Sequence, residues 1–574
     1  MRVWGFFALV FVLGLGLRVC GLSQLYHQDE YKWALAADAA SGSAQSILHP
    51  PLALFLYHHI GSFIGYENLR IVPAFLSLVL LVLLFVYLRS FFTTRAALLG
   101  SLLFAVTPYA LLGSLQIDID GVFLPLMTLI AFLGYLLWQR ASSFQEKKWG
   151  LWLGLGGLVL GFACKLSFVL VPLVLLVDVL MHSQKARLFL GKKEVWASLV
   201  GGAALLGAVL ALVWNHVYVF RYVDNFVAFH GRDYVEILFL SVKGGIYLSP
   251  LLFFGMFLGV RYRKELSLWY FFLLANFLFY FVAFDFSHRT FDRYLLFLVL
   301  PACVITAVWL DRALRIMTTK DEWRLFGIDS IFAFFLGVFV FDIFSLPHRV
   351  IPLLPKAAFI DAVMHGHWGF LLPMTGGSGP LGFYLPVDAL AVLWGVSGVG
   401  ALLALVGGLW WKKAGLTLLL SASLIYTGFV NSEYLFGAFY GNAGSIVSSL
   451  IQEIDRISSK EDVYQGLPLV RPLMRSGGII TYNDIGAYSL YARGLYAGRF
   501  YPHDQFVEGN RIKFAAHPGY YLFVNMPALG ASSVYTKYFA QCVQVAGKQS
   551  GQIAGYLLDC SRADPSVIRL GPRQ

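Results

Sequence analysis

Charged residues are scarce in this sequence. Asp, Glu, Lys and Arg make up 13% of its 574 residues, whereas hydrophobic residues make up 58% and the mean hydropathy is +0.70. Soluble domains carry about 25% charged residues, so the composition argues against an ordinary soluble enzyme. Apolar runs long enough to cross a bilayer, about 20 residues as a helix, recur along most of the chain. The sequence therefore predicts a polytopic α-helical membrane protein.

Cysteine is also scarce, with five residues in the chain. No C-x-x-C pair or clustered histidine accompanies them, which argues against a cysteine-based metal centre. Cys20, Cys164 and Cys303 lie in or beside predicted membrane helices and are expected to be small core residues. Cys542 and Cys560 both lie in the C-terminal tail, and an exported domain in an oxidising compartment is expected to pair them. Internal repeats, one signature of secondary transporters, are absent as well.

The net charge of +11 does not indicate nucleic-acid binding, because the basic excess lies in short loops between apolar runs. If the helices alternate and Met1 starts inside, each basic loop falls on the cytoplasmic side and the carboxyl terminus lies outside. We expect about thirteen membrane helices. They lie near residues 3–20, 70–88, 96–113, 121–138, 149–163, 166–181, 195–215, 243–260, 266–284, 294–310, 325–345, 388–410 and 414–430.

The first apolar run has two readings. An arginine near its start and an apolar core would suit a signal peptide, but Arg18 precedes Cys20 and no small-x-small cleavage site follows. We therefore expect a retained helix. Arg18 either extends to the membrane interface or faces a phosphate, and the sequence does not separate these two roles.

The segments on the outer side carry the unusual residues. The first outer loop, about 21–69, contains "YHQDEYKW" and "ILHPPLALFLYHH", and the second reads "SLQIDID". The tail, 431–574, changes to a globular composition and predicts a small extracytoplasmic α/β domain. Its signals are an amphipathic helix and strand-like runs, near residues 443–458, 478–483, 520–525 and 553–558.

Four carboxylates gather in these outer loops. Charges beside a bilayer are costly unless they are solvated, paired or functional. Asp29 and Glu30 alone are equally consistent with a solvated loop start, but Asp118 and Asp120 lie in a loop too short to extend far from the membrane. The latter two are spaced i, i+2, so they can share a site only where the backbone is extended or turning. The two acidic pairs predict one shared site.

Cations fall on the same side. Lys165, in "FACKLSF", is isolated among apolar residues where two helices meet, so it must find an anion or reach water. His288, Arg289 and Arg293 lie in the fourth outer loop. Head-group binding is the alternative role of the two arginines, and pairing with a nearby carboxylate is that of Lys165. Together, carboxylates and cations predict a site with a base and phosphate-binding groups at the outer leaflet.

The order of these motifs resembles a known family. "DE" at 29–30, "HPPL" at 49–52 and an acidic second loop are similar to the protein O-mannosyltransferase and lipid A aminoarabinose transferase family. These are GT-C glycosyltransferases that use a polyprenyl-phosphate sugar. "CKLS" resembles the family's lysine-containing turn, and "RYLLFLVLP" resembles its late Arg-Tyr segment. The resemblance covers residues 1–310 and continues by architecture, with a membrane module at 1–430 and the α/β domain at 431–574.

The resemblance implies an inverting transferase in the cytoplasmic (inner) membrane, which moves a sugar from a polyprenyl phosphate to an extracytoplasmic acceptor. Asp29 would be the general base for the acceptor hydroxyl. One base suffices, because phosphate leaves without protonation and positive charge stabilises it. The other implied roles are catalytic for Glu30 and Asp120, orienting for Asp118 and His49, and donor-phosphate-binding for Lys165, His288, Arg289 and Arg293.

Several assignments stay open. A divalent cation held by Asp29, Asp118 and Asp120 is the cofactor to consider, and Asp118 departs from many bacterial relatives, which have a basic or neutral residue there. The alternative role of His49 is a hydrogen bond at the start of a helix. The sequence identifies neither the sugar nor whether the acceptor is a glycan, a lipid or a protein. The main alternative function is a transporter of a lipid-linked or small polar solute.

Overall fold

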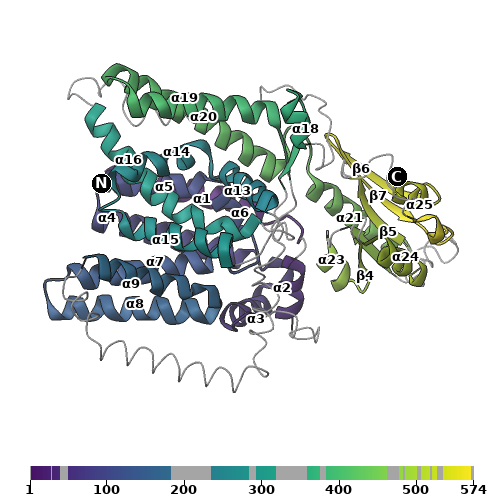
Figure 1. Cartoon of the computed structure of the whole chain (residues 1–574). Helices are drawn as coiled ribbons and strands as arrows, with labels where there is room; N and C mark the ends of the chain where they lie inside the picture. The colour runs from purple at the N-terminus through teal and green to yellow at the C-terminus, as the bar shows by residue number, and fades with distance from the viewer. Residues whose placement is uncertain are drawn as a thin grey trace.

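The computed structural model has a bundle of helices with a smaller α/β domain at one end (Figure 1). The N-terminus lies in the bundle, at the end away from the α/β domain. The structure describes residues 2–26, 29–38, 49–182, 234–283, 292–317, 359–374, 383–461, 478–482, 485–500, 506–517, 520–525 and 534–569.

Six helices in these ranges are long and apolar enough to cross a membrane, or up to eight if each of two bent pairs is one span. The helices are α1 (Arg2–Gly21), α2 (Asp29–Ala37), α3 (Leu52–Ile64), α4 (Ile71–Phe91), α5 (Thr94–Val106), α6 (Pro108–Ser114), α7 (Phe123–Arg140), α8 (Phe144–Cys164), α9 (Leu170–His182), α13 (Tyr234–Leu248), α14 (Pro250–Leu258), α15 (Ser267–Leu278), α16 (Val299–Met317), α18 (Phe359–Met364), α19 (Val387–Val406) and α20 (Leu409–Phe436). Short turns and one strand pair complete this part, namely η3 (Tyr66–Asn68), η4 (Leu166–Val169), η5 (Gly259–Tyr262), η6 (Phe279–Ala283), η7 (Asp292–Leu298), β1 (Leu371–Met374) and β2 (Phe383–Pro386).

Two of the predicted helices are bent rather than straight. The helix expected at 96–113 bends by 65° between α5 and α6, and the one expected at 243–260 bends by 100° between α13 and α14. Each second segment begins with a proline, Pro108 or Pro250, which lacks the N–H that a continuous helix needs. Two more predicted helices, 195–215 and 325–345, lie outside the described residues, so the count of about thirteen stays a prediction.

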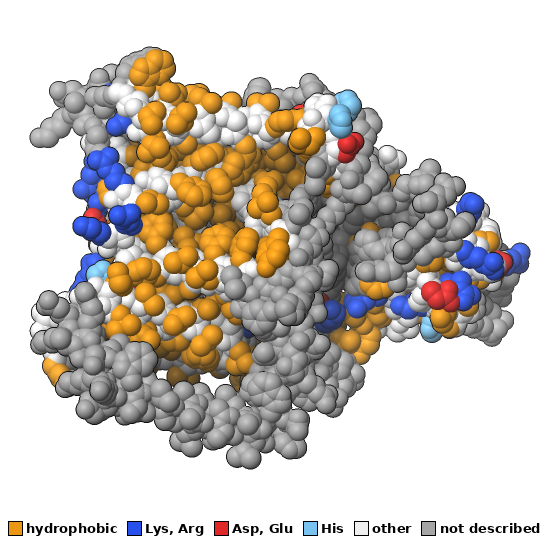
Figure 2. Space-filling view, in the orientation of Figure 1, with side chains coloured by type: hydrophobic (Ala, Val, Ile, Leu, Met, Phe, Trp, Pro, Cys, Tyr) orange, Lys and Arg blue, Asp and Glu red, His pale blue; other side chains and the backbone are white. Residues whose placement is uncertain are grey.

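The outside of the bundle is apolar. Figure 2 shows a broad hydrophobic surface over the helices. Lys and Arg gather at the end of the bundle away from the α/β domain, and others lie on that domain. Large side chains such as Trp152 and Val159 on α8 are 60% and 66% exposed. Such a surface is stable against lipid and would be an aggregation hazard in water. The chain is therefore an integral membrane protein.

A bend follows the C-terminal end of α5, and two other helices cap that end. The break at Pro108 leaves carbonyl groups at the end of α5 without helical partners. From α1, Arg18 Nη1 donates to the Ala105 carbonyl at 3.2 Å. From α20, Asn431 Nδ2 donates to the Val106 carbonyl at 2.7 Å. These contacts stabilise the bend and so direct α6 into the second outer loop.

Arg18 therefore has a role that differs from both alternatives drawn from the sequence. Its side chain is fully buried, donating also to the Ser77 hydroxyl at 2.6 Å and the Gly14 carbonyl at 3.0 Å. Its charge lies at the negative end of the α5 dipole. Its described contacts join it to helix backbone, a hydroxyl and the Phe104 ring, within the bundle and not at its surface.

Beyond α20 the chain forms a five-stranded sheet in the order β4-β3-β5-β7-β6. The first three strands in that order are parallel, and β7 is antiparallel to both β5 and β6. The helix α21 covers the range predicted to be an amphipathic helix, and its Ile446, Leu450 and Ile454 are all buried. The elements are α21 (Ala443–Glu461), β3 (Ile479–Tyr482), α23 (Ala487–Ala492), β4 (Tyr496–Phe500), α24 (Val507–Ala516), β5 (Tyr520–Asn525), α25 (Val534–Phe539), β6 (Val543–Ser550), β7 (Ile553–Asp559) and η11 (Pro565–Val567).

This α/β domain contacts the first outer loop. Gly486 N donates to the Tyr26 carbonyl at 3.3 Å, and the Tyr26 and Tyr488 rings lie 5.7 Å apart. The Tyr31 ring of α2 lies 5.1 Å from the Tyr496 ring of β4. The domain therefore packs against the short helix α2, which begins with Asp29 and Glu30.

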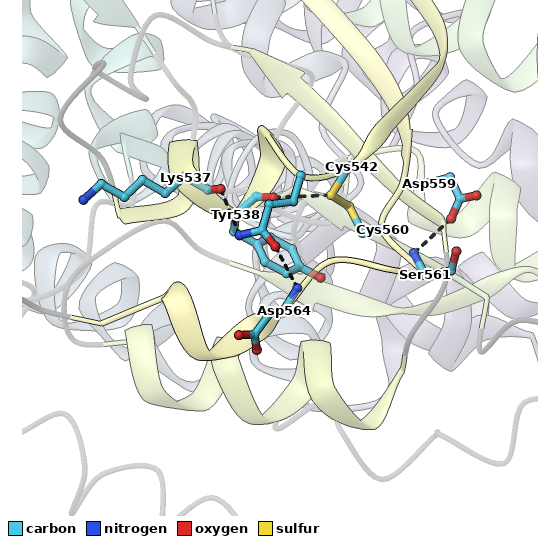
Figure 3. The surroundings of a disulfide bond; sticks show 8 residues. Lys537, Tyr538, Cys542, Asp559, Cys560, Ser561 and Asp564 are labelled. Atoms are coloured by element: carbon cyan, nitrogen blue, oxygen red, sulfur yellow. Dashed lines mark hydrogen bonds between the residues drawn. A yellow bond between two sulfur atoms is a disulfide. The ribbon is translucent and has the colours of Figure 1, made fainter.

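Cys542 and Cys560 form a disulfide, as the sequence predicts (Figure 3). The bond joins the residue before β6 to the residue after β7, so it closes the open end of that hairpin. Around it, Asp564 N donates to the Gln541 side chain at 3.0 Å. The bond restricts the unfolded chain and holds the end of the sheet together.

Replacing both Cys542 and Cys560 with Ser should lower the stability of the α/β domain by about 3 kcal/mol, because the unfolded loop regains its freedom. Hydrogen exchange of the β6–β7 amides measures the loss. Cys20→Ser, at an exposed free cysteine of α1, is the control and should change nothing. Equal exchange in the double variant and the parent would contradict a stabilising bond.

Arg18→Met should lower the free energy of unfolding by about 1–3 kcal/mol, because the Ala105 carbonyl loses its buried donor. Thermal unfolding in detergent measures the shift. Arg95→Met, at an arginine whose side chain is 45% exposed and 3.8 Å from Asp311, is the matched control. Its effect should stay below about 1 kcal/mol. Equal effects of the two variants would show that Arg18 does not cap α5.

Candidate functional site

The adjacent carboxylates at the start of α2 point to different partners. Asp29 Oδ2 pairs with Arg293 Nη1 at 2.9 Å, and its Oδ1 pairs with Lys32 Nζ at 2.5 Å. Glu30 lies about 100° further around the helix and is fully buried on another side. Carboxylates in the first turn also face the positive end of the helix dipole. Neighbours in sequence therefore have different surroundings.

Glu30 binds Arg70 with both oxygens. Arg70 Nε donates to Oε1 at 3.0 Å and Nη2 donates to Oε2 at 2.6 Å. Ile117 N, in the second outer loop, donates to the same Oε1 at 3.2 Å. Arg70 also donates to the carbonyls of Gln24 and Leu25. Glu30 and Arg70 thus join α2, the N-terminus of α4 and the second outer loop.

The second outer loop turns, so that Asp118 and Asp120 reach one site in spite of their i, i+2 spacing. Ile117 and Ile119 alternate with them and are buried in an apolar cluster. Tyr57 of α3 donates its hydroxyl to the Asp118 carbonyl at 3.0 Å, which fixes the backbone at this point. The alternation of isoleucine and aspartate therefore puts the apolar side chains on one side and the carboxylates on the other.

Arg293, at the start of η7, connects the two loops. Its Nη1 lies 2.9 Å from both Asp29 Oδ2 and Asp118 Oδ2, and its Nε lies 4.0 Å from Asp120 Oδ2. The Tyr294 ring centroid lies 5.2 Å from the guanidinium carbon. Residues from three distant parts of the sequence therefore form one charged cluster.

Lys165 completes this cluster. It is the single residue between the end of α8 and the start of η4. Its backbone is extended, with φ −157° and ψ 138°, and its side chain turns towards Asp120. Nζ donates to Oδ1 at 2.6 Å and to Oδ2 at 2.9 Å. Nζ also lies 5.2 Å from the Tyr294 ring centroid. Lys165 is thus paired with a carboxylate and lies beside Arg293.

Glycines of α7 and α8 make the position of Lys165 possible. A Cβ at Gly134 would lie 2.2 Å from Gly154 N, and one at Gly150 would lie 2.5 Å from Trp138 N. Real Cβ atoms do not approach backbone this closely, so larger residues would force the two helices apart. Close packing of α8 on α7 thus sets the position of the C-terminal end of α8 and, with it, the position of Lys165.

Burial shifts the pKa values of His49 and Asp118 in opposite directions. Burial, followed by the Lys165 charge, lowers the pKa of His49 to about 3, so His49 is neutral at pH 7. Its ring stacks on Trp33, with centroids 6.0 Å apart. Burial raises the pKa of Asp118, and the Arg293 charge opposes that rise. A neutral His49 can orient a ligand by hydrogen bonding but adds no positive charge for a phosphate.

A pocket leads away from the charged cluster. It encloses about 520 Å³ of space, part of it open to solvent. Asp120, Arg293 and Tyr294 line its polar end. The remaining wall comes mainly from apolar side chains of α7, η4, α9, α15 and η7, including Leu124, Pro125, Phe168, Val171, Phe272 and Phe297. A molecule with an anionic head and an apolar chain suits this division.

The predicted site residues differ in how they are placed. Asp29, Asp118, Asp120, Lys165 and Arg293 come together, and Glu30 lies in the adjoining buried ion pair. His288 and Arg289 lie outside the described residues.

Sequence reasoning missed three contributors, Arg70, Tyr57 and Tyr294. The signal available for Arg70 was a charge at the start of an apolar helix, which needs a partner in the membrane. Tyr294 stood next to Arg293 in the quoted segment.

A divalent cation was the open cofactor question. Within the described ranges, no group of three or more His, Cys, Asp or Glu side chains is arranged to hold a metal ion. Arg293 lies between the Asp29 and Asp118 carboxylates, where a shared cation would have to be. This arrangement does not fit a metal held by these residues.

Comparison with family models gives a match to part of the chain. Residues 48–214 match the model of the dolichyl-phosphate-mannose-protein mannosyltransferases. That range contains His49, Asp118, Asp120 and Lys165, whereas Asp29 and Arg293 lie outside it. No curated protein matches the chain.

Solved structures also match this chain, at low sequence identity. ArnT from Cupriavidus metallidurans, bound to undecaprenyl phosphate, is 14% identical, with a TM-score of 0.49 over 97% of this chain and 98% of that one. An oligosaccharyltransferase from Archaeoglobus fulgidus, in its apo form, is 11% identical, with a TM-score of 0.44 over 91% of this chain and 69% of that one. The family match, over residues 48–214, confirms the resemblance to the GT-C glycosyltransferases and with it the predicted class of enzyme.

Proposed function

We propose that this protein is an inverting glycosyltransferase that moves a sugar from a polyprenyl phosphate to an acceptor outside the cytoplasmic membrane. The observation that carries this proposal is the charged cluster of Asp29, Asp118, Asp120, Lys165 and Arg293 at the polar end of an apolar pocket. A base, phosphate-binding cations and space for a lipid chain are then side by side. These are the parts that the reaction needs.

The donor phosphate would bind beside Lys165 and Arg293. Lys165 has three N–H donors, and its contacts with the two Asp120 oxygens at 2.6 and 2.9 Å leave one for a phosphate oxygen. The Arg293 guanidinium suits a phosphate group because it is planar and carries several donors. The prenyl chain would then follow the apolar wall formed by α7, α9 and α15, and its burial would supply affinity.

The chemical step would be a single displacement at the anomeric carbon. The acceptor oxygen forms a bond to that carbon as the bond to the phosphate oxygen breaks, and polyprenyl phosphate leaves with the electron pair. Asp29 accepts the acceptor proton. Lys165 and Arg293 stabilise the negative charge that develops on the phosphate. Attack opposite the leaving group inverts the anomeric centre.

The other carboxylates would act through these groups. Asp118 holds Arg293 against Asp29, and Asp120 holds Lys165. Glu30 positions α2 through Arg70 and the second outer loop, so its contribution would be the placement of Asp29. His49, neutral and stacked on Trp33, would orient a sugar or acceptor hydroxyl.

The orientation follows from the distribution of charge. Lys and Arg gather at the end of the bundle away from the α/β domain (Figure 2), which is the bias of cytoplasmic loops. The N-terminus would then be cytoplasmic, and the site and the α/β domain would be extracytoplasmic. Contact of that domain with α2 supports a role beside the acceptor, which is a glycan, a lipid or a protein.

A transporter is the second candidate, because two helix pairs are sharply bent and bent helices often form transport sites. The two functions differ in product. A transferase forms a new glycosidic bond and releases polyprenyl phosphate, whereas a transporter only moves its solute.

Asp29→Asn should lower the transfer rate by about 100- to 10,000-fold, because the acceptor loses its base. Purified protein in lipid would receive a panel of polyprenyl-phosphate sugars and an extract of envelope acceptors, and mass spectrometry would follow free polyprenyl phosphate and glycosylated product. Asp361→Asn, at an exposed carboxylate, is the matched control and should retain activity. Folded parent protein that consumes no donor would contradict the proposed function and favour transport.

Glu30→Gln should lower the free energy of unfolding by about 3 kcal/mol, because the Arg70 charge stays buried without its carboxylate. Asp29→Asn should lower it much less, since Arg293 keeps Asp118 as a partner. Thermal unfolding and turnover per folded molecule would be measured for both variants. A Glu30→Gln protein with parental stability and no turnover would show that Glu30 takes part in the chemistry directly.

A further inference from the structure

We propose that Lys32 is a latch on the candidate base, holding one oxygen of Asp29 until an acceptor hydroxyl displaces it. This inference rests on the proposed function, in which Asp29 takes a proton from the acceptor. It concerns a residue that has no place in the chemical step itself. Its effect would be to decide which hydroxyl, that of the acceptor or that of water, can reach the base.

Both oxygens of Asp29 are engaged in the structure. Lys32 Nζ lies 2.5 Å from Oδ1, and Arg293 Nη1 lies 2.9 Å from Oδ2. A general base must direct a lone pair at the proton that it takes, at hydrogen-bond distance from the attacking oxygen. A carboxylate held on both oxygens by cations is obstructed. One of the two cations must therefore move before the acceptor hydroxyl can bind.

Lys32 is the cation that can leave. Its side chain is 44% exposed, whereas that of Arg293 is 10% exposed. Arg293 Nη1 is also 2.9 Å from Asp118 Oδ2, so moving Arg293 would break two buried ion pairs together. Removing one partner of a buried pair is strongly unfavourable, while an exposed pair contributes about 1 kcal/mol or less. The lysine stem is flexible, and its ammonium group can return to water.

Lys32 lies on the side of Asp29 from which an acceptor would approach. Asp29 and Lys32 are spaced i, i+3 in the first turn of α2, which puts them on one face of the helix. Tyr31 of the same turn contacts Tyr496 of the α/β domain. The Oδ1 side of Asp29 therefore lies under a partly exposed lysine, next to the contact between α2 and that domain. The Oδ2 side faces Arg293, which lines the pocket proposed for the donor.

Without the latch, water would take the place of the acceptor. The water oxygen would form a bond to the anomeric carbon, the bond from that carbon to the phosphate oxygen would break, and polyprenyl phosphate would leave with the electron pair. Asp29 would accept the water proton. The products would be free sugar and polyprenyl phosphate, so the donor would be lost. Lys32 would suppress this hydrolysis while no acceptor is bound.

The test measures donor hydrolysis by the full-length protein in lipid, with the polyprenyl-phosphate sugar that supports transfer and with no acceptor. Lys32→Met should release free sugar about tenfold faster than the parent, a small part of the roughly 100- to 10,000-fold that a positioned base contributes. Lys32→Arg keeps a cation next to Asp29 and should hydrolyse donor at the parental rate. A merely structural role of Lys32 would lower hydrolysis together with transfer.

A double variant identifies the base that water uses. Lys32→Met combined with Asp29→Asn should return hydrolysis to the parental rate or below it. Equal hydrolysis by the parent and by Lys32→Met, in protein that transfers sugar, would overturn the latch and leave the proposed function standing. Fast hydrolysis by the double variant would also overturn it, because another group would then activate water. A parent that transfers no sugar to any acceptor would overturn the proposed function, and this inference with it.

Discussion

The ion pairs of Arg293 with Asp29 and Asp118 are the interactions on which the candidate site depends. They join the start of α2, the second outer loop and the start of η7, which are far apart in the sequence. Each charge alone would be costly beside a bilayer. Together with Lys165 and Asp120, each carboxylate of the cluster lies within ion-pair distance of a cation. The same ion pairs thus hold three carboxylates and two cations from distant parts of the sequence in one place.

The rest of the bundle fixes the segments that carry these charges. The Glu30–Arg70 pair attaches α2 to the second outer loop, and Tyr57 fixes the backbone at Asp118. Arg18 caps the broken end of α5, from which α6 continues into the same loop. Such support is what a preorganised site requires, because small displacements of reacting groups have large effects on rate.

Much of the site could be predicted from sequence, since charges near the membrane are few and each needs a reason. The two acidic pairs and Lys165 were identified in this way. Their individual roles could not be, because neighbours such as Asp29 and Glu30 differ only in what lies against them in space. The partner of Glu30 is Arg70, 40 positions away, and no local pattern connects the two. The bends at Pro108 and Pro250 were missed because apolar composition continues across each proline.

The most direct measurement is an experimental structure of the protein in lipid with polyprenyl phosphate bound. The account predicts phosphate oxygens within hydrogen-bond distance of Lys165 Nζ and of the Arg293 guanidinium, with the prenyl chain along the apolar wall of α7, α9 and α15. A phosphate bound elsewhere, with Lys165 and Arg293 still engaged only by Asp29, Asp118 and Asp120, would contradict it. The cluster would then be a structural ion network and not a site of glycosyl transfer.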